Sequence, residues 1–268
     1  MGRALDCGVP RYHVSDAIVL RRTPLPSGDV VVTLLSEHGT WRAVARKGRL
    51  PGGNLARLSL FHDVRVQAYR RREEDLAVLT QVSLNGALAA LTSPGVYPYA
   101  HLLADLADAL TVDVHVGEGM SRVVASALRG VARHDDPDAV ALAYAWRLVA
   151  LAGLAPRPAP CDRCGGPCTT LAVADGALRC GLHADHERDL WLGEEAAADL
   201  DRLLRAPLRE SVSRPPGDRA RAWRALLVHV REHVGEVRSL VSLVAAPPDG
   251  GRRGAAAAGP AAPPAAGS

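Results

Sequence analysis

Hydrophobic and polar residues alternate in several short segments of the first 84 residues, and such alternation is typical of β-strands with one buried face. The clearest case is the segment 63–69, in which Val64, Val66 and Ala68 fall on one side of a strand. Turn-forming stretches that contain Gly or Pro separate these segments. The predicted strands are residues 15–22, 29–36, 40–47, 62–70 and 76–84.

Five strands of this length, with the longest connection (48–61) after the third, predict a small closed β-barrel of the oligonucleotide-binding (OB) type. An SH3-like barrel is the alternative that the same strand pattern allows.

After Gly86 the hydrophobic residues recur every three or four positions, which indicates helices. Asp136 is suited to cap one of them, because Pro137 follows at the first helical position and Asp138 adds negative charge to the first turn. The predicted helices are residues 99–110, 119–133, 138–154, 194–205 and 218–234. The last one carries Trp223, Leu226, Leu227 and Val230 along one stripe.

The predicted fold class is therefore α+β with several domains. We expect a basic OB-like barrel (1–84), a helical body (85–155), a zinc-binding segment (156–188) inserted before the C-terminal helices (189–246), and a tail (247–268). The tail consists almost entirely of Ala, Pro and Gly, a composition that predicts disorder.

A metal site is predicted by the pair Cys161-x2-Cys164, which is followed, after fifteen intervening residues, by Cys180-x2-His183. Two tight turns that each offer two soft ligands suit one tetrahedral zinc ion. Cys168 lies just past the first turn and is an alternative to His183 as the fourth ligand. A thiol cluster or a disulfide is the other interpretation, but four cysteines within twenty residues of a 28.3 kDa chain fit it poorly.

The residues around this motif favour a structural rather than a catalytic zinc. A zinc deaminase needs an upstream His-x-Glu, and a metalloprotease of the zincin type needs His-Glu-x-x-His; neither sequence occurs. Four protein ligands would leave no coordination position open for water. A zinc-dependent enzyme remains an alternative that an open coordination position would support.

Charge is distributed unevenly along the chain. The net charge is only +3, but residues 1–72 contain thirteen basic and five acidic side chains, which suggests a polyanionic partner. The basic residues that we predict to contact nucleic acid on the barrel are Arg21, Arg22, Arg42, Arg46, Lys47, Arg49, Arg70, Arg71 and Arg72. Aromatic residues are scarce in the barrel, so we expect phosphate contacts to outweigh base stacking.

Other classes are disfavoured by what the sequence lacks. Lys47 is the only lysine and is not part of a Gly-Lys-[Ser/Thr] loop, so a phosphate-loop ATPase is excluded. The longest apolar stretch, 139–154, is interrupted by Arg147, and the N-terminus does not have the pattern of a signal peptide. Free cysteines with a zinc site favour a reducing cytoplasm.

The order of these parts resembles that of the RecO family of bacterial recombination mediators. The resemblance rests on Ala17-Ile18-Val19-Leu20-Arg21-Arg22, on the segment from Gly28 to Gly39, on Ala45-Arg46-Lys47-Gly48, and on Gly176-Ala177-Leu178-Arg179-Cys180 within the Cys/His segment. Two features depart from the family: Cys168 is an extra cysteine, and His183 stands where many relatives have cysteine.

This resemblance implies a non-enzymatic protein that binds single- and double-stranded DNA and anneals complementary strands. It also implies that the protein acts with RecR and the single-stranded-DNA-binding protein SSB to load RecA, in the bacterial cytoplasm and on the nucleoid when bound to DNA. An RNA-binding, translation-associated module is the alternative function, because a basic barrel with a zinc ribbon would serve there too.

Several residues have two interpretations at this point. Trp41 suits either the barrel core or a stacking platform, and the run from Arg70 to Arg72 suits either a DNA contact or a solvated hairpin tip. His229 and His233 are spaced either for a metal or for helix packing. The arginines of the last predicted helix form either an ordinary solvated face or a second surface for DNA or the SSB tail; they are Arg219, Arg221, Arg224 and Arg231.

Overall fold

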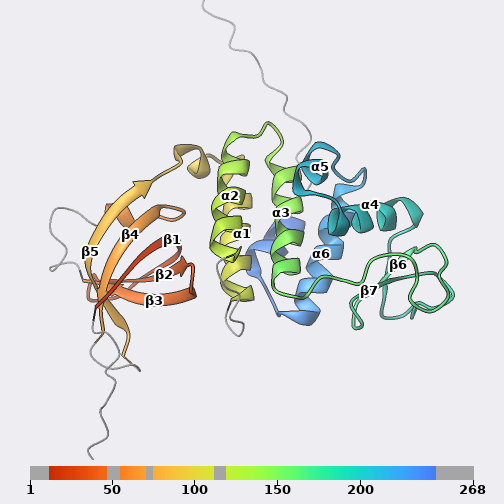
Figure 1. Ribbon diagram of the computed structural model, residues 1–268, viewed down its shortest axis with the longest axis horizontal. Helices are drawn as coiled ribbons and strands as arrows, with labels where there is room; N and C mark the ends of the chain where they lie inside the picture. Colours follow the sequence, from red (N-terminus) through yellow and green to blue (C-terminus); the bar gives the residue numbers. More distant parts are fainter. Residues whose placement is uncertain (1–11, 47–54, 71–74, 112–118, 246–268) are drawn as a thin grey trace, which may run out of the picture.

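A computed structural model of the chain describes residues 12–46, 55–70, 75–111 and 119–245. A β-barrel lies at one end of the long axis, three long helices stand beside it, and the Cys/His segment lies at the opposite end (Figure 1). The predicted tail and the basic residues Lys47, Arg49, Arg71 and Arg72 lie outside the described residues. Within those ranges, every helix is too short or too polar to traverse a lipid bilayer.

The barrel has the five predicted strands. They are β1 (Tyr12–Pro24), β2 (Val30–Ser36), β3 (Gly39–Ala45), β4 (Asp63–Tyr69) and β5 (Ala77–Gly86). They close in the order β1-β2-β3-β5-β4, and β3 pairs with β5 in parallel while all other pairs are antiparallel. This order confirms the OB-type barrel. Short 3-10 helices, Ala56–Leu58 and Ala89–Thr92, flank β4 and β5.

Alternating residues of β1 and β2 serve two different cores. Val19 and Leu34 point into the barrel, where they pack with apolar residues of the other strands. Ile18 and Leu35 point outward and join the core of the helices. Both faces of these strands are therefore apolar where the barrel meets the helical body, because both are removed from water.

The helical body is built on α1 (Tyr97–Leu110), α2 (Gly119–Arg133) and α3 (Pro137–Leu151). Helix α3 lies between α1 and α2 on one side and the C-terminal helices on the other (Figure 1), and its residues from Ala139 to Trp146 are buried. The predicted cap is present, because the Asp136 carboxylate accepts a hydrogen bond from the Ala139 amide at 3.0 Å. The helix ends three residues earlier than predicted, at Leu151, and Gly153 takes a positive φ of 75° just beyond it.

Four further helices follow: the first three pack on the other side of α3, and the last packs on α1 and α6. They are α4 (Glu194–Arg205), α5 (Leu208–Ser213), α6 (Arg219–His233) and α7 (Arg238–Ala245). Helices α4 and α6 were predicted, whereas α5 and α7 were not. Trp223, Leu226 and Val230 of the predicted stripe on α6 are buried, as expected.

The Cys/His segment contains a small sheet in the order β7-β6-β8. Its strands are β6 (Thr170–Ala172), β7 (Ala177–Arg179) and β8 (Leu190–Trp191). Leu171 and Leu178 belong to the same apolar cluster as the helices, so this segment packs on the helical body through a shared core.

Candidate metal centre and nucleic-acid interface

Two chain reversals bring the predicted metal ligands together. In the first, the Gly165 amide donates to the Cys161 carbonyl at 2.8 Å, and Gly165 has a φ of 71° that a side chain would disfavour. In the second, the His183 amide donates to the Cys180 carbonyl at 3.1 Å. Each reversal therefore presents two ligand atoms from one short turn, as the x2 spacing predicts.

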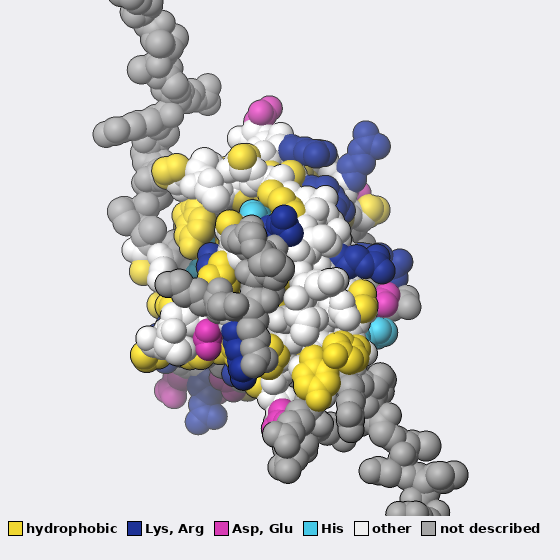
Figure 2. All heavy atoms as spheres, turned by 90° about the vertical axis from the view of Figure 1, so that its left-hand side faces the viewer, with side chains coloured by type: hydrophobic (Ala, Val, Ile, Leu, Met, Phe, Trp, Pro, Cys, Tyr) yellow, Lys and Arg dark blue, Asp and Glu magenta, His cyan; other side chains and the backbone are white. Residues whose placement is uncertain are grey.

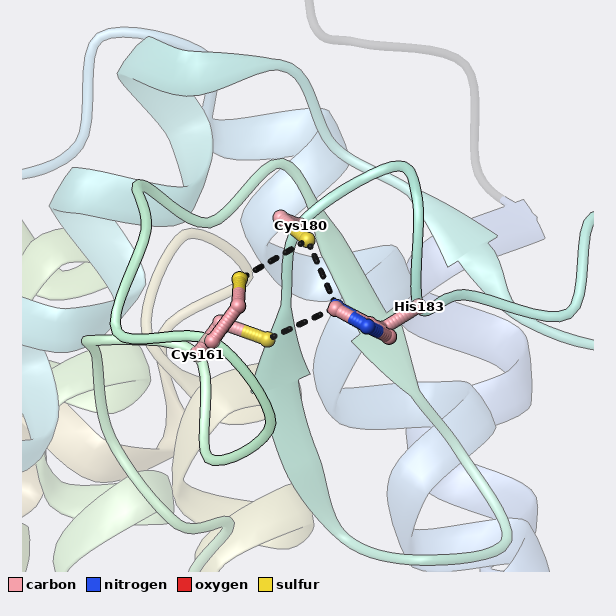
Figure 3. A group of neighbouring side chains, drawn as sticks. Cys161, Cys180 and His183 are labelled. Carbon is pink, nitrogen blue, oxygen red and sulfur yellow. Dashed lines mark hydrogen bonds between the residues drawn. The ribbon is translucent and has the colours of Figure 1, made fainter.

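The four ligand atoms of Cys161, Cys164, Cys180 and His183 all lie within 4.8 Å of one another and could hold a metal ion. The Sγ atoms of Cys164 and Cys180 are 3.6 Å apart, and the Nδ1 atom of His183 lies 3.2 Å from the Sγ of Cys180 and 3.8 Å from that of Cys161 (Figure 3). Tetrahedral zinc with usual bond lengths requires S–S and S–N separations of about 3.8 Å and about 3.6 Å. The donor set and its spacing therefore fit zinc.

Backbone amides prepare one of these thiols for metal binding. Hydrogen bonds from the backbone, first from Cys180 and then from Arg163 and Cys164, lower the pKa of the Cys161 thiol to about 6. Zinc binds the thiolate form, so Cys161 is favoured as a ligand at neutral pH. Cys161 and Cys180 are buried while Cys164 and His183 are exposed, and the site therefore opens to solvent on one side.

Cys168 does not belong to the group of four. It is buried nearby, and burial followed by the negative charges of Cys161 and Cys180 raises the pKa of its thiol to about 11. A protonated thiol is a poor zinc ligand. The geometry favours His183 over Cys168 as the fourth ligand.

An ion-pair cluster ties the two ligand turns to each other. Asp162, inside the first turn, accepts hydrogen bonds from Arg179 Nε at 3.3 Å and from Arg157 Nη2 at 3.1 Å. Arg179 directly precedes Cys180 and also pairs with Asp175 at 2.6 Å. Desolvation raises the pKa of Asp162, but the two arginines together hold it below its usual range. We did not predict this cluster from the sequence.

The basic residues predicted to bind nucleic acid are divided between different surroundings. Arg21 pairs with Thr33 across β1 and β2, and Thr33 pairs with Arg42 across β2 and β3, so Arg21 and Arg42 lie in one cross-strand row. Arg42 is exposed, and so is Arg46, just after β3. Arg21 is 51% exposed and pairs with Asp105 and Asp108 of α1 at 3.1 Å each. Arg21 therefore also joins the barrel to the helical body.

The other described members of the predicted set are less accessible. Arg22 is half-buried and its Nε atom is enclosed without a hydrogen-bond partner. Arg70 is half-buried at the end of β4. When the barrel end faces the viewer, the Lys and Arg side chains are scattered around it rather than gathered in one patch (Figure 2).

The residues with two interpretations take mostly structural positions. Trp41 is half-buried against the barrel core, and His229 and His233 hydrogen-bond the carbonyls of Leu154 and Val173. Arg219 pairs with Asp136 and Asp138 and so holds α6 against the start of α3. Arg224 and Arg231 are exposed on α6.

Comparison with protein-family models agrees with this arrangement. The family model described as "Recombination protein O N terminal" matches residues 11–87, and the one described as "Recombination protein O C terminal" matches residues 93–240. The chain belongs to the RecO family. The first match covers the barrel and the second covers helices α1 to α6 together with the Cys/His segment, so this RecO-family protein has a role in DNA repair and recombination.

Proposed function

We propose that this RecO-family protein is a non-enzymatic recombination mediator that binds single- and double-stranded DNA and anneals complementary strands. The observation that carries this proposal is exposed Arg42 on β3 of an OB-ordered barrel, with exposed Arg46 beside the strand's end; Arg42 lies in one cross-strand row with Arg21, whose guanidinium also contacts Asp105 and Asp108. Guanidinium groups in such a row neutralise phosphates without reading bases. Two complementary strands held in this way are free to pair.

The Cys/His segment supports the fold rather than the chemistry in this proposal. One zinc ion, held by Cys161, Cys164, Cys180 and His183, would stabilise a region whose three strands contain only two or three residues each. With four protein ligands the ion has no position left for a substrate.

We propose that the protein acts in the cytoplasm with SSB and RecR to load RecA on SSB-coated DNA. The family assignment and the absence of a membrane-spanning helix among the described residues support this proposal.

The experiment compares DNA binding and annealing by the wild-type protein and by the double variant Arg42→Ala/Arg46→Ala. We expect the variant to bind all sequences more weakly, to lose about 0.7 units of salt slope per lost single-strand phosphate contact, and to anneal SSB-coated complementary strands more slowly. Arg188→Ala/Arg209→Ala removes the same charge from exposed positions far from the barrel and is the matched control.

Equal effects of the two double variants would assign the loss to net charge and would contradict a role for the barrel surface. A wild-type protein that prefers RNA over DNA of the same sequence would support the translation-associated alternative instead.

A further inference from the structure

Two tyrosines, one exposed and one half-buried, form an aromatic pair on a side of the barrel that the basic row does not include. Tyr12 of β1 and Tyr69 of β4 are register partners, and their ring centroids are 5.2 Å apart with an interplanar angle of 51°. Tyr12 is 60% exposed. A large aromatic side chain left in water at the edge of a pair often marks a binding surface.

A groove of about 450 Å³ adjoins this pair. Val14 and Gln67 are the next register partners on the same face of β1 and β4, and both line the groove. The opposite side of the groove is formed by β5. Its lining residues there are Thr80, Gln81, Val82 and Ser83.

Two arginines stand in the groove. Arg57 is anchored, because its Nη1 atom donates to the Val82 carbonyl at 2.9 Å, and its guanidinium has no second partner among the described residues. Arg65 is 60% exposed, and its contact with Asp16 is long, at 3.8 Å. Exposed ion pairs of this kind contribute little and exchange readily for another anion.

We infer that the outer face of β1, β4 and β5 binds an extended single strand of DNA, with bases stacked on Tyr12 and Tyr69 and phosphates held by Arg57 and Arg65. This inference rests on the proposed function and identifies a second DNA-contacting surface of the barrel. Tyr69 and Arg65 are four positions apart along β4, a distance of about 13 Å in a strand, which a few nucleotides of an extended chain span.

The chemistry of this face selects a single strand over a duplex. Tyrosine rings stack on a base only when the base has left its own stack, and the polar side chains between the rings and the arginines then face the base edges. An acidic peptide would match the arginines but has no planar ring in its acidic side chains to stack on the tyrosine pair.

The test compares two oligonucleotides with the same number of phosphates, one of deoxythymidine and one of abasic deoxyribose. In Tyr12→Ala/Tyr69→Ala we expect affinity for the deoxythymidine strand to fall at least about fivefold, since stacking contributes about 1–3 kcal/mol per base. Affinity for the abasic strand should not change. Tyr12→Phe/Tyr69→Phe keeps both rings and should bind like wild type, and Trp191→Ala removes an equally exposed aromatic side chain far from the barrel as the matched control.

If the alanine variant loses affinity for both oligonucleotides alike, or for neither, while the wild-type protein still binds DNA, the inference is overturned. Failure of the wild-type protein to bind either strand at low salt would instead contradict the proposed function itself. Photocrosslinking of wild-type protein to a strand with 5-iododeoxyuridine gives a readout independent of variant folding. The adduct is expected in peptides with Tyr12 or Tyr69, and adducts found only elsewhere would refute the assignment.

Discussion

Cys164 and Cys168 are four positions apart in the sequence but lie in different chemical surroundings. Cys164 is exposed in the first ligand turn, 3.6 Å from the sulfur of Cys180. Cys168 is buried outside the group of four, with a thiol whose pKa is raised to about 11 by burial and by neighbouring thiolates. One cysteine is therefore placed as a ligand and the other as part of the apolar packing.

Replacing each of these cysteines by serine separates the two roles. We expect Cys164→Ser to weaken zinc binding by at least about tenfold, since even changes next to a metal ligand cost that much. Cys168→Ser should keep one zinc per chain. Elemental analysis and competition with a chromogenic chelator measure both quantities, and a Cys168→Ser protein that loses its zinc while Cys164→Ser retains it would contradict the proposed ligand set.

At this scale, the sequence was sufficient to predict the Cys/His group that could hold a metal ion, but not the ion pairs that support it. The spacing of Cys161, Cys164, Cys180 and His183 reflects local turn geometry, so it is visible in the sequence. The contact between Asp162 and Arg179 joins residues seventeen apart through the folding of a sheet, and no local pattern encodes it. The sequence predicted Arg21 as a DNA contact. It did not predict the ion pair of Arg21 with Asp105, because that pair depends on how the barrel packs on α1.

Among the elements, long segments with a regular hydrophobic repeat were predictable from the sequence, and short segments were not. Helix α4 runs over Glu194–Arg205, as predicted, because apolar residues recur every three or four positions among charged ones over about three turns. Helix α5 has six residues and strand β8 has two, too few to show a period. Their conformations depend on the shared core rather than on intrinsic preference.

Helix α6 is fixed to the helical body at both ends. Near its start, Trp223 Nε1 donates to Asp138 at 2.8 Å. Near its end, His229 Nε2 lies 2.6 Å from the Leu154 carbonyl, and its ring is 4.4 Å from that of His233. Burial, assisted by the charge of His233 and opposed by the hydrogen bond to Leu154, lowers the pKa of His229 to about 4.

This lowered pKa makes the stability of α6 depend on pH. The unfolded chain protonates His229 near pH 6.5, but the folded protein does so only near pH 4. Unfolding therefore takes up a proton between these values, and the free energy of unfolding should fall as the pH falls through this window. Thermal unfolding of zinc-saturated protein between pH 7.5 and pH 5 measures the effect.

The variant His229→Gln should be less stable at pH 7.5 but should lose less of its stability on acidification than the wild-type protein. His186→Gln, at an exposed position, should follow the wild-type curve. Parallel curves for His229→Gln and wild type would show that His229 does not contribute to the pH dependence.

On the scale of the whole molecule, the barrel has its own core, whereas the helices and the Cys/His segment share one. Val19, Val32 and Leu79 pack inside the barrel, and Leu171 of the Cys/His segment packs in the cluster of the helices. The barrel joins this body through Ile18 and Leu35 and through polar contacts such as that of Thr40 with Thr111 at 3.0 Å. The sequence indicated the separate periodic stretches, but the sharing of one core follows from tertiary packing.

Removal of zinc should therefore destabilise some parts of the molecule more than others. Without the metal, the two ligand turns lose the bonds that hold them together, and β6 and β7 are too short to stay paired alone. Because Leu171 and Leu178 would then leave the shared core, we expect faster amide exchange in residues 156–192 and, to a smaller extent, in α4 and α6. The strands of the barrel should keep their protection, since their core contains no residue of that segment.

Hydrogen–deuterium exchange with mass spectrometry, before and after chelation, measures this distribution, and readdition of zinc should restore the original rates. DNA binding by the chelated protein gives a second measurement, because a barrel that remains folded should keep most of its affinity for single strands. Equal loss of protection in β1–β5 and in the Cys/His segment would mean that the two cores unfold as one cooperative unit, and the zinc ion would then support DNA binding as well as local structure.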